Sequence, residues 1–136
     1  MNTQTTPTGR TTASSIIQSR VRDIQEAARG VTKQYPRSYI LQCIKEDRFP
    51  DELWQALGKF GLLGLSIPEE HGGSGGGVLE ITALNEALAL AGVPTLFLVV
   101  TGLARVPIVR HGTKEQIAKY VTPTCTGEKK MCFAIT

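Results

Sequence analysis

The sequence lacks the residue patterns of a disulfide scaffold and of a metal centre. Its three cysteines are odd in number and form no C-x-x-C pair, which argues against a secreted disulfide-rich domain and favours a reducing, cytoplasmic setting. The two histidines, His71 and His111, are far apart, and neither has a second ligand residue at metal-binding spacing. We therefore expect both histidines to be solvated or hydrogen-bonded, and no metal site.

An excess of positive charge and a supply of aromatic rings are also missing. The 136 residues include 15 Lys and Arg against 12 Asp and Glu, but Arg10, Arg20 and Arg22 precede the first acid, Asp23, so the charges after that point balance. Aromatic residues make up only 6% of the chain and offer few platforms on which bases could stack. Both features argue against a nucleic-acid partner.

No uninterrupted hydrophobic run is suited to crossing a membrane. The longest uncharged run, 18 residues between Glu86 and Arg105, reaches the lower limit for a span on length alone. Pro94 interrupts it in the middle, because proline removes a backbone donor and disfavours helical geometry at Val93. We expect two helices buried in a protein core here and no membrane span.

The first residues have the composition of an unstructured segment. Residues 1–13 are rich in threonine and contain no hydrophobic run, so they are predicted to form a flexible tail. An Arg-bearing, acid-free start is also typical of a mitochondrial transit peptide, which would place the protein in the mitochondrial matrix. The absence of an amphipathic Arg-rich helix in these residues favours the tail.

Apolar periodicity predicts a mostly helical chain from residue 14 onward. Ile17, Val21, Ile24 and Ala28 recur at spacings of three or four, with charged residues between them. The fold class is therefore all-α, a bundle of about five to six helices with one terminal β-strand. Beyond the first helix, helices are expected over 39–44, 50–60, 79–91, 95–110 (kinked or interrupted at Pro107) and 113–121, a loop over 61–78 and a strand over 131–135.

Two features invite a catalytic interpretation and fall short of one. Five glycines between residues 72 and 77 fit neither the G-x-G-x-x-G nor the P-loop spacing, so they are predicted to form a flexible turn. Glu69, Glu70, Glu80 and Glu86 are candidate bases, but none has a second catalytic group at a defined spacing. We expect Glu69 and Glu70 to be solvated and Glu86 to have a hydrogen-bond partner.

Several motifs in the same order resemble the acyl-CoA dehydrogenases over residues 14–136. FPDELWQALGKFGLLGLSIPEEHGGSGGG (49–77) is similar to the segment that joins the early helices of that family to its buried helix pair. NEALA (85–89) and IVRHGTKEQIAKY (108–120) resemble later elements, and MCFAIT (131–136) resembles the opening of a flavin motif. The resemblance implies a helical N-terminal domain over 14–128 and the first strand of a truncated β-barrel domain over 129–136.

The resemblance also implies an activity for the complete protein. The family uses FAD to dehydrogenate an acyl-CoA thioester between its α and β carbons, as in fatty acid β-oxidation, and passes electrons to an electron-transfer flavoprotein. The family's catalytic glutamate lies in its C-terminal domain, so no catalytic residue is assigned here, and the chain alone is expected to be inactive and to hold FAD weakly. A complete protein of this kind is expected to be a homo-oligomer.

Site residues follow from the same resemblance. By position, Phe133, Ile135 and Thr136 would line the flavin ring. The acyl tunnel would be lined by Leu96, Val99, Val100 and Leu103, for which plain core packing is the alternative.

Two other functions stay open at this point. Some relatives with this fold hydroxylate aromatics or oxidise nitroalkanes, and the helical domain does not exclude them. A free-standing helical module that binds a partner through its exposed last strand is the third hypothesis.

Overall fold

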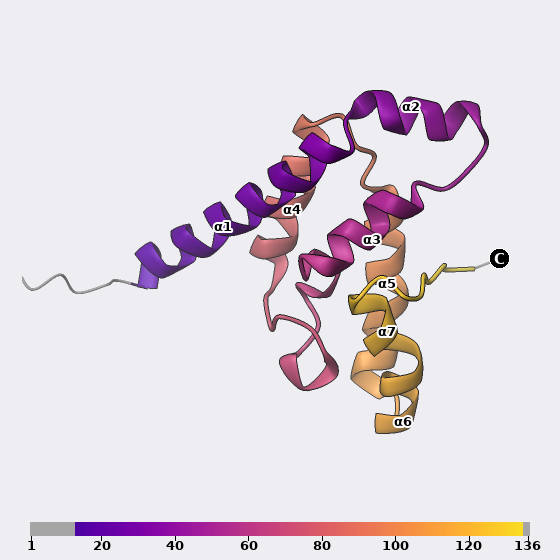
Figure 1. The fold of residues 1–136 in the computed structure, drawn as a ribbon. Coiled ribbons are helices and arrows are strands. Elements are labelled where there is room, and N and C mark those ends of the chain that lie inside the picture. The colour runs from indigo at the N-terminus through magenta and orange to yellow at the C-terminus, as the bar shows by residue number, and fades with distance from the viewer. Residues whose placement is uncertain (1–12, 135–136) are drawn as a thin grey trace, which may run out of the picture.

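The predicted helices are present in the computed structural model, which describes residues 13–134 (Figure 1). The tail over residues 1–13, and with it the transit-peptide alternative, lies outside the described residues except for Ala13. The long helices are α1 (Ala13–Gln34), α2 (Arg37–Lys45), α3 (Asp51–Lys59), α4 (Val78–Leu90) and α5 (Leu96–His111). The shorter elements are two 3₁₀ turns (Leu62–Gly64 and Glu69–His71), α6 (Lys114–Gln116), a π-helical turn (Ile117–Val121) and α7 (Thr122–Cys125).

Local sequence signals set several helix boundaries. Gly61 ends α3 in the left-handed conformation at φ +71°. Thr113 and Gln116 form the predicted capping box at the start of α6: the Gln116 amide donates to Thr113 Oγ1 at 3.3 Å, and the Thr113 amide donates to Gln116 Oε1 at 2.8 Å. Pro107 does not interrupt α5, which continues through it to His111. Pro107 is exposed, so the carbonyl that loses its intrahelical partner lies on the solvent side.

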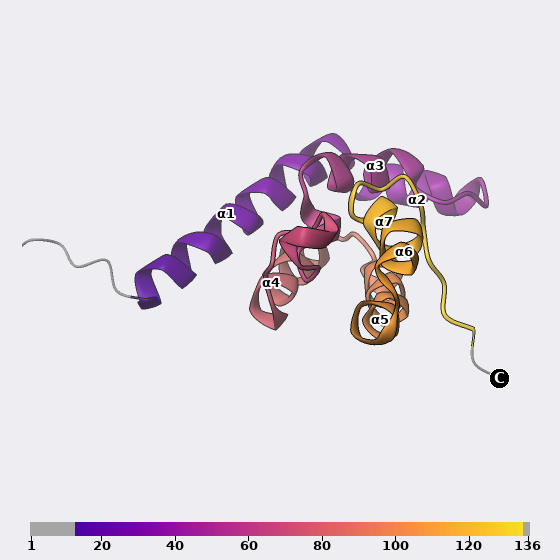
Figure 2. The ribbon, with the colours of Figure 1, turned by 90° about the horizontal axis from the view of Figure 1, so that it is seen from below.

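The long helices form two layers. In Figure 2, α1, α2 and α3 make up one layer, and α4 and α5 extend from it as two separate arms. The apolar core lies where these layers meet, and its largest fully buried side chains include Trp54, Leu53, Leu57 and Leu88. A smaller apolar cluster joins the π-helical turn and α7 to the loop after α3, and it consists of Ile67, Ile117, Val121 and Cys125.

The run of 18 uncharged residues is divided between the two arms. α4 ends at Leu90, the chain turns at Gly92 with φ +75°, and α5 begins at Leu96. Within residues 13–134, no helix combines the length and apolar character that a membrane span requires. The prediction of two separate helices is confirmed, but neither helix is fully buried, because Leu90 of α4 and Leu96 of α5 are exposed.

The described residues after Gly127 form an irregular segment that lies against α3 and α5. Residues 129–134 adopt no regular secondary structure, and the described part of the chain contains no strand, because nothing there offers the backbone partners that a strand needs. Trp54 Nε1 and Gln55 Nε2 both donate to the Gly127 carbonyl, at 2.9 and 2.7 Å. Thr101 Oγ1 donates to the Met131 carbonyl at 3.3 Å. The segment is therefore fixed by side chains of α3 and α5.

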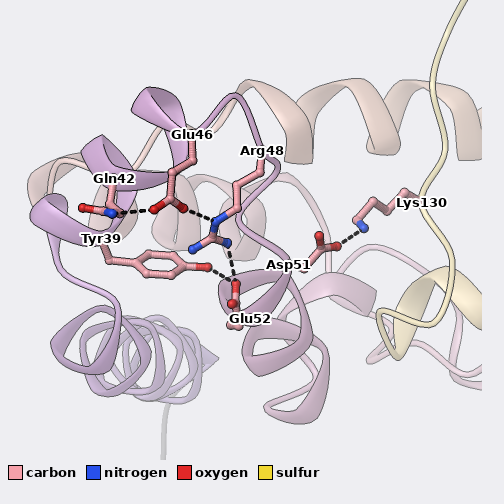
Figure 3. Close-up of polar contacts among 7 residues, drawn as sticks. All are labelled: Tyr39, Gln42, Glu46, Arg48, Asp51, Glu52 and Lys130. Carbon is pink, nitrogen blue, oxygen red and sulfur yellow. Dashed lines mark hydrogen bonds and ion pairs between the residues drawn. The ribbon is translucent and has the colours of Figure 1, made fainter.

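A polar network on the surface joins α2 to α3 (Figure 3). Tyr39 donates its hydroxyl hydrogen to Glu52, and Arg48 pairs with the same carboxylate at 3.1 Å. Arg48 also pairs with Glu46 at 2.7 Å, and its guanidinium lies 5.5 Å from the centre of the Tyr39 ring. Nearby, Lys130 pairs with Asp51 and ties the C-terminal segment to the start of α3.

This network predicts an acid-dependent loss of stability. Hydrogen bonds from Tyr39 and Arg48 lower the pKa of Glu52 from 4.5 to about 2. Because this pKa is lower in the folded than in the unfolded state, the stabilisation is complete above the unfolded value and is lost as the pH falls through the folded value. We expect the melting temperature of the wild-type chain to fall more steeply with acidification through this window than that of Glu52→Gln.

The matched control is Glu26→Gln, which removes the same charge from an exposed position of α1 outside the network. Melting followed by circular dichroism at several pH values compares the three proteins. If Glu52→Gln and Glu26→Gln have the same acid profile, the Tyr39 and Arg48 contacts do not stabilise the fold.

Candidate functional site

An apolar groove of about 470 Å³ lies between the two arms α4 and α5. Trp54 of α3 and the leucines of the turn after it close one side of the groove. The α4 wall includes Val78 and Ile81, and the α5 wall includes Val99 and Leu103. A concave, mostly apolar surface of this size is typical of a small-molecule site.

A glycine on the α5 wall keeps the groove open. A Cβ built on Gly102 would meet no atom within 4 Å, so this position faces unfilled space. Val99 and Leu103 lie beside it with 45% and 53% of their surface exposed. The space between α4 and α5 is thus lined with apolar groups that the described residues leave uncovered.

The four residues expected to line an acyl tunnel are divided between two cavities. Val99 and Leu103 line the groove between α4 and α5. Leu96 and Val100 line a second apolar cavity of about 430 Å³ on another side of α5, next to α2 and α3. Residues four apart share a helix face, which explains why the set separates into these two pairs. Leu96 is 71% exposed, so the alternative of core packing does not describe it.

A buried arginine also lines the groove. Arg105 of α5 is only 4% exposed and donates from Nη1 to the Leu63 carbonyl and from Nη2 to the Thr124 carbonyl, the latter at 2.9 Å. Burial lowers the pKa of Arg105, because the low-dielectric surroundings disfavour the charged form. Its Nε atom has no hydrogen-bond partner. Arg105 thus links α5 to the turn after α3 and to α7.

An asparagine faces the groove from the other arm. Asn85 of α4 donates from Nδ2 to the Ile81 carbonyl at 2.9 Å, while its buried Oδ1 has no partner. Neither Asn85 nor Arg105 is among the site residues expected from the sequence, yet both line the groove. The available signal was Arg105 itself, the first charge after a run of 18 uncharged residues.

The glycine cluster forms a turn, as predicted, but internal hydrogen bonds hold its amides. The Gly73, Gly75 and Gly76 amides donate to the carbonyls of Pro68, Ile67 and Leu65. Gly72 and Gly75 have φ of +83° and +61°, which the chain needs to make these close approaches. Amides committed to internal acceptors are not available to a phosphate.

The candidate carboxylates have structural contacts. Glu80 accepts from the Gly77 amide at 2.8 Å and lies 3.6 Å from Arg20, and these contacts lower its pKa. Glu86 accepts from Gln25 at 2.9 Å, which confirms the expected partner, although Glu86 is exposed. Glu69 and Glu70 are exposed, as expected. No group of three or more potential metal-binding side chains occurs within the described range.

The residues assigned to the flavin form no enclosed site here. Phe133 is 48% exposed, and it lies on the irregular C-terminal segment. Ile135 and Thr136 lie outside the described residues. Of the three assigned residues, the structure describes only the exposed ring of Phe133, and no walls enclose it, so the described residues do not fit FAD by themselves.

Comparison with known proteins places this helical chain in a family. Residues 18–128 match the family model described as acyl-CoA dehydrogenase, N-terminal domain. Acyl-CoA dehydrogenase FadE12 of Mycobacterium tuberculosis (strain H37Rv) is 33% identical over 127 residues, which are 92% of this chain and 33% of that protein. The caffeyl-CoA reductase-Etf complex subunit CarC of Acetobacterium woodii is 36% identical over 116 residues, which are 83% of this chain and 31% of that protein.

A solved structure agrees with these matches. The crystal structure of a probable acyl-CoA dehydrogenase from Mycobacterium abscessus superposes with a TM-score of 0.72 and 29% identity, covering 87% of this chain and 31% of that one. The chain thus spans about one third of the length of these relatives. It belongs to the acyl-CoA dehydrogenase family, to whose N-terminal domain it corresponds.

Proposed function

We propose that this chain forms the acyl-side wall of an FAD-dependent acyl-CoA dehydrogenase, which dehydrogenates an acyl-CoA thioester between its α and β carbons. The observation that carries the proposal is the open apolar groove between α4 and α5 in a member of this family. An alkyl chain gains about 0.8 kcal/mol for each methylene that it buries, and the groove offers apolar walls on both arms. The chain's part is to bind and orient the acyl group and to exclude water.

The residues of the groove have different roles in this proposal. Val99 and Leu103 contact the acyl chain, and Gly102 leaves the room that it occupies. Leu96 and Val100 remain predicted tunnel residues, but their place in the second cavity gives them weaker support. The exposed apolar side chains of α5 also fit a helix that further parts of a longer protein cover.

The cofactor and the electron acceptor belong to the same proposal. FAD supplies the hydride acceptor in this family, and Phe133, Ile135 and Thr136 stay predicted flavin neighbours. A relative named as a subunit of a complex with Etf supports an electron-transfer flavoprotein as the partner. A homo-oligomer and a role in fatty acid β-oxidation are parts of the proposal that follow from the family, whereas the proposed cytoplasmic location follows from the cysteine pattern. We assign the catalytic base to no residue of this chain.

The test uses the native polypeptide that contains this sequence, purified with any flavin it holds. Acyl-CoA is expected to bleach the visible absorbance of the oxidised flavin and to yield enoyl-CoA. Bleaching by a nitroalkane, or oxygen-dependent hydroxylation of an aromatic, would identify one of the other flavoenzyme activities and overturn the proposal. The absence of flavin together with tight capture of another protein would support the interaction module instead.

Gly102→Leu is expected to weaken acyl-CoA binding about tenfold. The new side chain takes the space of about two methylenes of the acyl chain, and each contributes about 0.8 kcal/mol. The variant is expected to fold, because the Cβ at this position meets open space and leucine has a higher helix propensity than glycine. Gly30→Leu in α1 is the matched control, since its Cβ also meets no atom within 4 Å and it lies outside the groove. Equal binding by the two variants would show that the acyl chain lies elsewhere.

A further inference from the structure

Two residues separate the groove between α4 and α5 from the second apolar cavity. Among the residues that the structure describes, only Trp54 of α3 and Thr101 of α5 line both spaces. The groove has a volume of about 470 Å³ and the second cavity about 430 Å³, so these two side chains form a partition between spaces of similar size. Both spaces have mostly apolar walls, to which an alkyl chain can bind.

The indole of Trp54 is the larger part of this partition and is held in one orientation. Its Nε1 donates to the Gly127 carbonyl at 2.9 Å. Its ring makes edge-to-face contacts with Phe49 and Phe97, whose ring centres lie 6.0 and 5.9 Å away, and both of these residues line the second cavity. Rotation of the indole toward either space would break these contacts, so the side chain is fixed in place.

Thr101 completes the partition on α5. The residue is buried, and its Oγ1 donates to the Met131 carbonyl at 3.3 Å. It lies between Val100, which lines the second cavity alone, and Gly102, which lines the groove alone. The boundary between the two spaces along α5 is therefore at Thr101.

We propose that Trp54 sets the maximum length of the alkyl chain that the groove accepts, because the chain ends against the partition and does not enter the second cavity. The acyl identity of that chain rests on the proposed function, whereas the limit on its length rests on the two cavities and the side chains between them. Under this inference, Leu96 and Val100 contact an acyl chain only after Trp54 is replaced by a smaller residue. Trp54 is thus a specificity-determining residue of the groove.

The test measures the affinity of the full 136-residue chain for saturated acyl-CoAs of increasing length by calorimetric titration. Each methylene that enters the groove is expected to strengthen binding about fourfold, and this gain is expected to stop where the chain meets Trp54. Trp54→Leu opens the partition, so the gain is expected to continue over two further methylenes and the longer ligands to bind about fifteenfold more tightly than to the wild-type chain. Phe60→Leu is the matched control, because it also replaces a ring by leucine but lines neither space.

A second variant tests the partition with Trp54 in place and decides the matter if Trp54→Leu does not fold. Val100→Phe partly fills the second cavity, and it is expected to leave the affinities of the otherwise wild-type chain unchanged. In a folded Trp54→Leu background, the same change is expected to abolish the gain for the longer ligands. Weaker binding of long acyl-CoAs to the Val100→Phe single variant would overturn the inference, because a chain would then enter the second cavity past Trp54.

Failure of this inference and failure of the proposed function give different results. Acyl-CoA binding that strengthens without a limit in the wild-type chain, or that reaches the same limit in a folded Trp54→Leu, overturns the role of Trp54 and leaves the proposed function standing. n-Alkanols of increasing length are titrated into the same samples. A length limit for the alkanols that Trp54→Leu extends, without any binding of acyl-CoA, supports the partition and counts against the acyl ligand. Absence of binding by both series overturns both proposals.

Discussion

Gly58→Ala is expected to destabilise the chain by about 3 kcal/mol, at the upper end of the usual cost of overpacking. The added Cβ would lie 2.1 Å from the Thr126 carbonyl oxygen and 2.5 Å from its carbon. Both atoms are backbone, so no side-chain rotation can make room. Trp54 and Gln55 hold the adjacent Gly127 carbonyl against the same helix, and therefore the segment cannot retreat without losing these hydrogen bonds.

The control for this prediction is Gly30→Ala in α1. Both glycines lie inside helices, where alanine is normally better by about 0.5 to 1 kcal/mol. Gly30 has no atom within 4 Å of a built Cβ, so its substitution is expected to stabilise the chain by that amount. Urea denaturation followed by circular dichroism measures both variants. A stabilising effect of Gly58→Ala would mean that α3 does not contact residues 126 and 127 as described.

The case of Gly58 shows what the sequence alone could not predict. Apolar periodicity and turn residues were sufficient for the helices, because each depends on neighbours along the chain: Gly61 ended a helix and Thr113 began one as expected. Helix propensity alone would predict that Gly58→Ala stabilises the chain. The close approach between α3 and residue 126 is a long-range contact, and no local pattern encodes it.

At the candidate site, too, the sequence predicts what depends on local pattern and does not predict what depends on long-range packing. The family resemblance implied four tunnel residues on α5, and two of them, Val99 and Leu103, line the groove that is proposed to hold the acyl chain. It could not predict that Leu96 and Val100 belong to another cavity, because that depends on where α2 and α3 pack. The burial of Arg105 could not be predicted, because its partners, the carbonyls of Leu63 and Thr124, are backbone groups far away in the sequence.

The predicted terminal strand is absent from the described residues 131–134, and the reason is different. The apolar residues 131–135 have strand propensity, but a strand is defined by hydrogen bonds to a neighbour. In the described residues that segment instead uses its carbonyls to bind side chains, as when Thr101 donates to Met131. Lys130 adds an ion pair to Asp51 and lies 4.5 Å from the centre of the Phe49 ring. Anchoring by side chains thus takes the place of sheet pairing.

Trp54→Ala is expected to cost about 3 to 5 kcal/mol, the usual range for truncating a buried tryptophan. Trp54 is 1% exposed and lines both the groove and the second cavity, so its removal would join the two spaces. The change also removes edge-to-face contacts with Phe49 and Phe97, at 6.0 and 5.9 Å between ring centres.

Two further variants separate packing from hydrogen bonding at this position. Trp54→Phe keeps an aromatic ring, and Gln55 still donates to the Gly127 carbonyl, so a loss of only about 1 kcal/mol is expected. Phe60→Ala, at an apolar side chain that is 55% exposed, is expected to cost less than either Trp54 variant. Because this tryptophan is the only one in the chain, unfolding is followed by circular dichroism rather than fluorescence. If Trp54→Ala were no more harmful than Phe60→Ala, Trp54 would not be the side chain that separates the two cavities and supports the core.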